Sequence, residues 1–218
     1  MNKAVIFDLD GTLIDSLEDL ANSVNETLTE FNLPLHTVDE YKYFIGNGAK
    51  VLIQRACENC NVNDELLDTL HKRFEIIYKD KINSKTKVYK GIYELLSKLE
   101  EVNLQKAILS NKPHTFTVDY ANKFFKDFTF VNIFGQKDNI PKKPDPQVAL
   151  NILEEFKLEA KDVYFIGDTK VDMQTAKNAG MIAIGVLWGF RDEKELRENG
   201  ADYIVSTPDE IWELIKTT

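Results

Sequence analysis

Two carboxylates with a spacing of two residues stand near the start of the chain. Asp8 and Asp10 come directly after the apolar run Ala4–Phe7. In an extended segment, residues i and i+2 point to the same side, so both carboxylates would lie close together at the carboxyl end of the strand. Two like charges this close are unfavourable unless a cation lies between them or one carboxyl is protonated. Both arrangements suit catalysis, although Asp-Leu-Asp-Gly is also an ordinary transition from strand to turn.

Groups that could bind a phosphate follow at two places. Gly11 lets the backbone turn sharply, which would bring the amides around Gly11 and Thr12 toward a phosphate. Ser110 and Asn111 end a second apolar run, Ala107–Leu109. A hydroxyl and an amide at that position can donate hydrogen bonds to phosphate oxygens. Taken alone, the pair would also fit a polar strand end.

A lysine pair precedes a helical pattern later in the chain. Lys142 and Lys143 are followed by Pro144 and Pro146, which would hold the loop in few conformations. A lysine is a compact cation and can bind phosphate as a point charge. The alternative to phosphate binding is that the two lysines lie in a solvated surface loop.

The last motif, Gly167-Asp168-Thr169, ends another buried apolar run, and Asp172 follows it. If a helix begins here, Asp168 and Asp172 lie four residues apart on one face. Oxygen ligands of this kind suit Mg²⁺, a hard cation that also contacts substrate phosphates. The alternative role for an aspartate here is helix N-capping.

Apolar runs alternate with amphipathic helical patterns along most of the chain. Near-continuous apolar runs are typical of strands that are buried on both faces. Strands that alternate with helices predict a parallel sheet with right-handed crossovers, and ligands bind at the carboxyl ends of such strands. The expected strands are Ala4–Phe7, Ala107–Leu109, Val163–Ile166 and Ile182–Val186, with less marked patterns at Phe130–Ile133 and Tyr203–Val205.

Helical periodicity without a convincing strand runs from about residue 15 to residue 82. We therefore expect an α/β core domain at 1–14 and 83–218, with a small helical domain at 15–82 inserted after the first strand. The segment Phe44–Gly48 would form a flexible polar loop between two helices of this insertion. Its residues Gly46, Asn47 and Gly48 are candidates for substrate binding, and a plain interhelical turn is the alternative.

Taken together, the four motifs resemble those of the haloacid dehalogenase superfamily of aspartyl phosphotransferases. The resemblance covers nearly the whole chain, including a helical cap of the first type at the place of the insertion. It implies a doubly wound, Rossmann-like parallel sheet with a strand order near 3-2-1-4-5. Haloacid dehalogenases share this scaffold, but the pattern of metal ligands here resembles that of the phosphatases. The matching segments are Asp8–Leu13, Ser110, Lys143-Pro144, and Gly167-Asp168-Thr169 with Asp172.

The resemblance also implies a role for each motif residue. Asp8 would be the nucleophile and a metal ligand. Asp10 would act as general acid and base, and its backbone carbonyl would bind metal. Ser110 and Lys143 would hold the transferring phosphoryl group. Asp168 would bind Mg²⁺, with Asp172 beside it as a direct or indirect ligand.

The cap is expected to select the leaving group, and three segments resemble the phosphoglycolate phosphatase branch. The expected activity is hydrolysis of a small phosphorylated metabolite, 2-phosphoglycolate first among them. Alternatives on the same scaffold are a pyrophosphatase, a nucleotide or sugar-phosphate phosphatase, and a phosphomutase like β-phosphoglucomutase. A phospho-accepting signalling module is a further alternative from another class. The three segments are the loop 44–48 with Leu52 and Arg55, Ser110–Pro113, and Leu187–Arg191.

Composition limits the partners and the location. The 218 residues are 43% hydrophobic and 29% charged, which is typical of globular proteins. The net charge of −9 disfavours a nucleic acid partner, which would need clustered Lys and Arg. No apolar stretch is long enough for a bilayer and no signal peptide pattern opens the chain, so we expect a cytoplasmic protein without a membrane partner. The composition leaves monomer and homodimer equally open.

The two cysteines, Cys57 and Cys60, have C-x-x-C spacing. Zinc would normally require four ligands, and no second Cys or His pair lies nearby in the sequence. We expect a structural role, with redox chemistry as the alternative.

Overall fold

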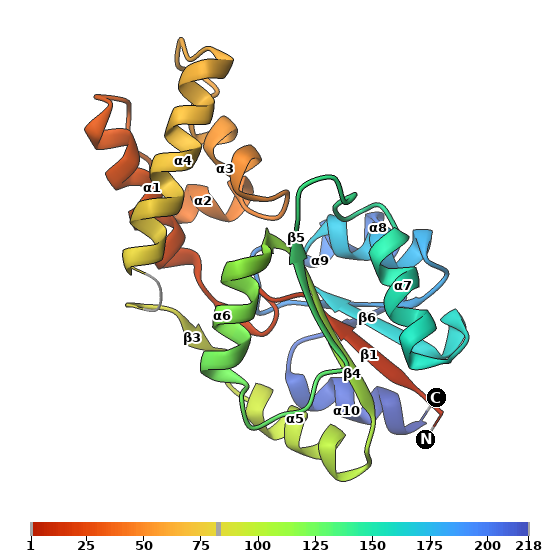
Figure 1. Ribbon diagram of the computed structural model, residues 1–218. Coiled ribbons are helices and arrows are strands. Elements are labelled where there is room, and N and C mark those ends of the chain that lie inside the picture. Colours follow the sequence, from red (N-terminus) through yellow and green to blue (C-terminus); the bar gives the residue numbers. More distant parts are fainter. Residues whose placement is uncertain (1, 82–83, 218) are drawn as a thin grey trace. The chain divides into compact units, whose positions relative to one another are not determined.

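The computed structural model describes residues 2–81 and 84–217, and the chain folds into two compact units (Figure 1). The sheet unit comprises residues 1–14 and 88–218, and the helical unit comprises residues 15–87. The predicted return to the core between residues 82 and 83 lies outside the described residues. In the structure the helical unit ends at Lys87, and the sheet unit resumes at Val88.

The sheet unit is built on a six-stranded sheet with the order β5-β4-β1-β6-β7-β8. Each pairing within it is parallel. Numbered by their succession in this sheet, the strands read 3-2-1-4-5-6, so the predicted doubly wound order is confirmed and a sixth strand extends it. The strands are β1 (Ala4–Phe7), β4 (Gln105–Pro113), β5 (Asn132–Gln136), β6 (Val163–Gly167), β7 (Ile182–Val186) and β8 (Tyr203–Val205).

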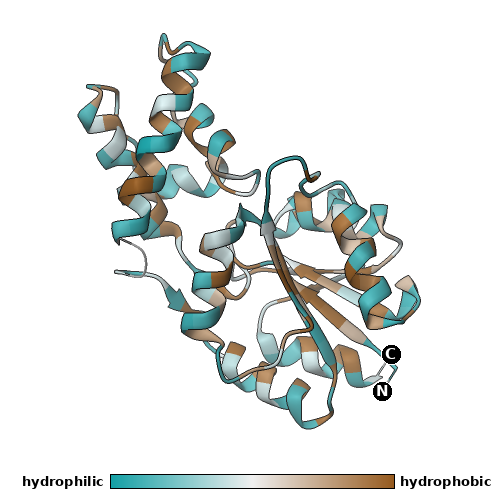
Figure 2. Cartoon of the chain, in the orientation of Figure 1, coloured by the Kyte–Doolittle hydropathy of each residue, from teal (hydrophilic) through white to brown (hydrophobic). Residues whose placement is uncertain are grey.

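Helices cover both faces of this sheet, which is consistent with the continuous apolar runs of β1 and β6 and of the middle of β4 (Figure 2). On one face, residues of α7 and α8 join β1, β4 and β6 in a core cluster. Helices α5, α6 and α10 lie on the other face (Figure 1). The helices are α5 (Ile92–Glu101), α6 (His114–Phe124), α7 (Gln147–Phe156), α8 (Lys170–Asn178), α9 (Glu193–Glu198) and α10 (Pro208–Thr217), with a 3₁₀ turn at Ala160–Asp162.

The register of the central strands sets where the polar motifs meet. Phe7 at the end of β1 lies opposite Ile108 of β4 on one side and Ile166 of β6 on the other. The residues that follow Phe7, Ile108 and Ile166 therefore emerge side by side at the carboxyl edge of the sheet. This edge is where open α/β sheets bind ligands.

Two strands begin at other residues than predicted. Strand β4 begins at Gln105 instead of Ala107 and continues to Pro113 instead of ending at Leu109. Strand β5 begins at Asn132 instead of Phe130, and most of its residues are half-buried, as fits an edge strand without a continuous apolar run. Helix α8 begins at Lys170, directly after the Gly167-Asp168-Thr169 motif. A capping box between Thr169 and Asp172 fixes that start, because Asp172 Oδ2 accepts hydrogen bonds from the Thr169 amide at 3.0 Å and from the Thr169 hydroxyl at 2.7 Å.

The helical unit buries apolar residues at the helical spacing that the sequence shows, including Leu20, Val24 and Leu28 on α1 and Leu70 and Phe74 on α4. Two short strands, β2 and β3, pair where the chain leaves and re-enters the sheet unit; the sequence did not predict them. The helices are α1 (Leu17–Glu30), α2 (Val38–Phe44), α3 (Ala49–Ala56) and α4 (Asp64–Lys81), and the strands are β2 (Ile14–Asp15) and β3 (Lys87–Val88).

Cys57 and Cys60 follow α3, and neither is in a disulfide. Burial raises the pKa of the Cys57 thiol to about 11, and the nearby Cys60 adds to this rise. A raised pKa disfavours the reactive thiolate. No helix in the described part of the chain is both long enough and apolar enough to cross a membrane.

Candidate active site

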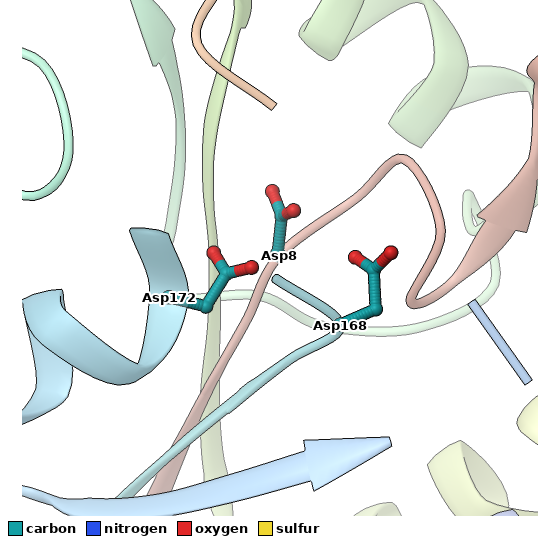
Figure 3. Close-up of side chains that lie close together, drawn as sticks. All are labelled: Asp8, Asp168 and Asp172. Atoms are coloured by element: carbon teal, nitrogen blue, oxygen red, sulfur yellow. The ribbon is translucent and has the colours of Figure 1, made fainter. Parts of the chain in front are cut away.

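Three aspartates meet at the carboxyl edge of the sheet (Figure 3). Asp8 follows β1, Asp168 follows β6, and Asp172 lies in the first turn of α8. Each offers one carboxylate oxygen, and these three oxygens all lie within 4.8 Å of one another. All three residues are buried. The predicted convergence of these motifs in space is therefore present.

Lys143 supplies the positive charge among these carboxylates. Its Nζ lies 2.8 Å from Asp8 Oδ1 and 2.7 Å from Asp172 Oδ1. The lysine is buried, which by itself lowers its pKa, but the carboxylates of Asp172 and Asp8 outweigh burial and raise the pKa. Lys143 is therefore charged at neutral pH and stands where it could also contact a phosphoryl group.

The Asp8 carboxylate is held in an unusual electrostatic state. Burial raises its pKa from the ordinary 3.8 to about 7, and the negative charges of Asp172 and Asp10 add to the rise, while Lys143 opposes it. Its Oδ1 is buried and, within the described residues, lacks a hydrogen-bond partner of good geometry, so the contact with Lys143 is an ion pair. A buried carboxylate oxygen left in this way is suited to receive a further cation.

Asp168 is fixed by two donors from different segments. Its Oδ1 accepts a hydrogen bond from Thr12 Oγ1 at 3.2 Å, and its Oδ2 accepts one from the Phe190 amide at 2.8 Å. Burial raises the pKa of Asp168 well above its usual range, and the charges of Asp172 and Asp8 add to this. The Thr12 hydroxyl thus contacts a carboxylate in this structure, and substrate binding by Thr12 stays a prediction.

Gly11 makes room for Asp168. Its φ of +86° favours glycine, and a Cβ atom at this position would lie 2.2 Å from Asp168 Oδ2. The amides of Gly11 and Thr12 bond to the carbonyls of Ile14 and Leu9 within the turn, at 2.8 and 3.3 Å. Their predicted contact with phosphate therefore stays a prediction.

The side chain of Asn111 forms hydrogen bonds with both the carbonyl and the amide of Lys143. Its Nδ2 donates to the Lys143 carbonyl at 3.0 Å, and its Oδ1 accepts from the Lys143 amide at 2.9 Å. The side-chain amide of Asn111 therefore holds the residue whose ammonium contacts Asp8, and substrate binding by Asn111 stays a prediction. Ser110 is also buried at this edge, and its Oγ accepts the Lys112 amide at 3.2 Å.

Asp10 is paired with a lysine to which the sequence gave no role. Lys112 Nζ lies 3.2 Å from Asp10 Oδ1 and 3.1 Å from Asp10 Oδ2. The lysine side chain is 3% exposed and the aspartate side chain 11% exposed. The cluster therefore has two ion-pairing centres, Lys143 for Asp8 and Lys112 for Asp10.

The candidate cap residues Gly46, Asn47 and Gly48 lie in the helical unit, between α2 and α3. Arg55 braces this loop: its guanidinium donates to Asn47 Oδ1 at 2.8 Å and to the Phe44 carbonyl at 3.0 Å. The loop is thus a held turn, and substrate binding by these three residues stays a prediction.

Comparison with known proteins identifies the family. The model of the haloacid dehalogenase-like hydrolase family matches residues 5–186. The chain belongs to this family. A phosphoglycolate phosphatase of Pseudomonas savastanoi pv. phaseolicola is 32% identical over 217 residues, covering 98% of this chain and 78% of that protein. One from Haemophilus influenzae is 32% identical over 208 residues, covering 93% of each.

A solved structure agrees with these relatives. A protein from Haemophilus somnus 129PT, described as a predicted phosphoglycolate phosphatase, superposes with a TM-score of 0.90 at 28% identity over 97% of both chains. As a haloacid dehalogenase-like hydrolase with such relatives, the chain is a phosphoric monoester hydrolase.

Two contacts at this site could not be predicted from the sequence. The Phe190 amide reaches Asp168 through main-chain atoms, which any residue type could provide. Trp188 donates its indole N–H to the Thr12 carbonyl at 3.0 Å, so the segment after β7 braces the turn that carries Asp10. For Lys112, the available signals were its place two residues after Ser110 and its position within the segment Ser110–Pro113 that resembles the phosphoglycolate phosphatase branch.

Proposed function

We propose that this hydrolase is an Mg²⁺-dependent phosphatase that forms an aspartyl-phosphate on Asp8. The observation that carries the proposal is the buried Asp8 carboxylate, which Lys143 contacts at 2.8 Å and which shares a small space with Asp168 and Asp172. A nucleophile, a fixed cation and further oxygen ligands therefore stand together at the edge where the sheet binds ligands.

The residues present fit a hard divalent cation. The donor set is three carboxylates, and the buried Asp8 Oδ1 lacks a well-directed hydrogen bond from the described residues. Asp8 and Asp168 would hold the ion, with Asp172 directly or through a water, and the Asp10 carbonyl in addition. When bound, Mg²⁺ would offset the repulsion between the carboxylates and the incoming phosphate dianion.

The chemistry then divides among the side chains of the sheet unit. An Asp8 oxygen forms a bond to phosphorus while the ester P–O bond breaks. Asp10 gives a proton to the departing oxygen, so the product leaves as an alcohol. Lys143 balances the charge that collects on the phosphoryl oxygens. Water next attacks phosphorus and gives a proton to Asp10, and the bond between Asp8 and phosphorus breaks to release inorganic phosphate.

For the substrate we infer 2-phosphoglycolate, with glycolate and phosphate as products. The names of the relatives support this choice. A screen of phosphate esters with Mg²⁺, ranked by kcat/KM, tests it. We expect 2-phosphoglycolate to rank above pyrophosphate, nucleotides and sugar phosphates. A flat ranking, or a sugar phosphate that is isomerised without release of phosphate, would contradict the substrate assignment.

Removal of Mg²⁺ is expected to abolish activity, and return of the ion should restore it. Thermal unfolding gives a readout that does not depend on turnover. At an Mg²⁺ concentration about 100-fold above Kd, the ion would stabilise the fold by about 2.7 kcal/mol. For a chain of this size that corresponds to a Tm increase of roughly 5–10 °C. An unchanged Tm together with full activity after chelation would contradict the metal assignment.

The stabilisation by Mg²⁺ should grow with pH. The folded-state pKa of Asp8 is raised from 3.8 to about 7, so folded Asp8 keeps a proton that the unfolded chain has lost. Its contribution to stability without metal is full below about pH 4 and is lost as pH rises through about 7. Mg²⁺ competes with that proton. The Tm increase from Mg²⁺ should therefore be larger at pH 8 than at pH 5.5, and equal increases would contradict this linkage.

A further inference from the structure

Lys112 is a buried lysine whose ammonium contacts both oxygens of one carboxylate. Its Nζ lies 3.1 and 3.2 Å from the two Asp10 oxygens, and it also lies 4.9 Å from the centre of the Tyr120 ring. Burying an ammonium costs several kcal/mol unless a partner offsets the loss of water. Asp10 and the face of the Tyr120 ring provide such partners, so the surroundings of Lys112 stabilise its charged ammonium.

The main chain of Lys112 is also held on both sides. Its amide donates to Ser110 Oγ at 3.2 Å, and its carbonyl accepts from Thr117 Oγ1 at 3.2 Å. The register of β4 with β5 shifts between Leu109 and Pro113, and such irregularities redirect side chains near active sites. With the main chain fixed in this way, the long side chain reaches Asp10, 102 residues away in sequence.

The two lysines of the cluster serve different carboxylates. Lys143 contacts Asp8 and Asp172, whereas Lys112 contacts Asp10. Contacts to both Asp10 oxygens restrict rotation of the carboxyl group about its bond to Cβ. An acid that must deliver a proton along one direction gains from that restriction, since catalysis depends on the orientation of the reacting groups.

We infer that Lys112 is a positioning residue for Asp10 and sets the direction in which Asp10 gives its proton to the leaving group. This inference rests on the proposed phosphatase mechanism. In the step concerned, the ester P–O bond breaks with its electron pair on oxygen, and the Asp10 proton moves to that oxygen. Lys112 keeps its own protons throughout and does not touch phosphorus.

The leaving group provides the readout. An alkyl phosphate must expel a strongly basic alkoxide, so it depends on proton delivery by Asp10. p-Nitrophenyl phosphate expels a stable phenolate and depends on it little. Because kcat/KM reports the steps up to the first phosphoryl transfer, a residue that only positions Asp10 should affect the alkyl ester selectively. A residue that holds the phosphate or the fold should affect both esters equally.

The experiment compares Lys112→Met with the wild type on 2-phosphoglycolate and p-nitrophenyl phosphate. We expect kcat/KM for 2-phosphoglycolate to fall by about 30–100-fold, which is at or just below the lower end of the ~10²–10⁴-fold range of acid–base catalysis, because Asp10 itself is still present. The value for p-nitrophenyl phosphate should fall by less than about threefold on the same reasoning. The matched control is Lys106→Met, because Lys106 is also a buried lysine of β4 and is ion-paired with Glu100. Lys106→Met should leave the ratio of the two esters unchanged.

Two further variants sharpen the result. Lys112→Met in an Asp10→Asn background should add little loss on 2-phosphoglycolate, since residues that act through one another are not additive. Lys112→Arg, which keeps the charge, should fold even if Lys112→Met does not and should recover part of the selectivity. Equal losses on both esters, or additive losses in the double variant, would overturn the inference. A wild type inactive on both esters with Mg²⁺ would instead overturn the phosphatase proposal itself.

Discussion

Replacing Asp8 with asparagine is expected to abolish ester hydrolysis, with kcat falling by on the order of 10⁶-fold, as for loss of a nucleophile that acts within a catalytic unit. Asparagine has nearly the same shape, so it fits the buried position beside Lys143. Its amide, however, cannot attack phosphorus to form an acyl phosphate. It also removes one negative charge from the set that would bind Mg²⁺. Nucleophile and metal ligand are thus lost together.

The measurement is turnover of 2-phosphoglycolate and p-nitrophenyl phosphate by pure Asp8→Asn protein with saturating Mg²⁺. Asp138→Asn serves as the matched control, because Asp138 is exposed in the loop after β5. That variant should retain wild-type rates. Undiminished hydrolysis by Asp8→Asn would remove the proposed mechanism for both substrates.

Replacing Lys143 with methionine should reduce both activity and stability. Methionine keeps the length of the side chain but leaves Asp8 and Asp172 without the ammonium that contacts them at 2.8 and 2.7 Å. Breaking a buried ion pair on one side typically costs ~3–5 kcal/mol. Loss of one group that stabilises charge in the transition state should lower kcat by about 10²–10³-fold. Chemical unfolding and steady-state kinetics measure the two effects.

The neighbouring lysine offers a matched control for this variant. Lys142 is exposed, and Lys142→Met should change neither quantity appreciably. Lys143→Arg keeps the charge, so it should recover stability better than rate, since its wide guanidinium would occupy space near the phosphoryl group. If Lys143→Met were as stable and as active as the wild type, the electrostatic account of the site would be wrong.

The strands of this fold could be predicted well where they are buried on both faces. Ala4–Phe7 and Ile182–Val186 carry continuous apolar runs, and the structure has strands at the same residues. The predicted start of the edge strand β5 was two residues too early, because half-buried positions give a weaker apolar pattern. Strand β4 was predicted too short at both ends, because the polar residues on either side of Ala107–Leu109 interrupt the apolar pattern.

The candidate site was predictable as far as strand ends determine it. Asp8 and Asp168 meet because the carboxyl ends of parallel strands lie at one edge, which chain order alone indicates. The contacts of Asn111 and Lys112 could not be predicted in the same way. They join positions 32 and 102 residues apart, and they depend on the register shift in β4 and on where long side chains end. The residue types at a strand end specify neither the register shift nor the positions that the ends of long side chains reach.

The covalent intermediate is the most direct test of the central claim that Asp8 attacks phosphorus. Wild-type protein would be mixed with ³²P-labelled substrate and Mg²⁺, quenched with acid within one turnover, digested and sequenced by mass spectrometry. The account predicts acid-stable, hydroxylamine-labile label on the peptide that contains Asp8, at a substantial fraction of one phosphate per chain, and none in Asp8→Asn. Label on another residue, or rapid turnover in which no protein-bound phosphate forms, would contradict it.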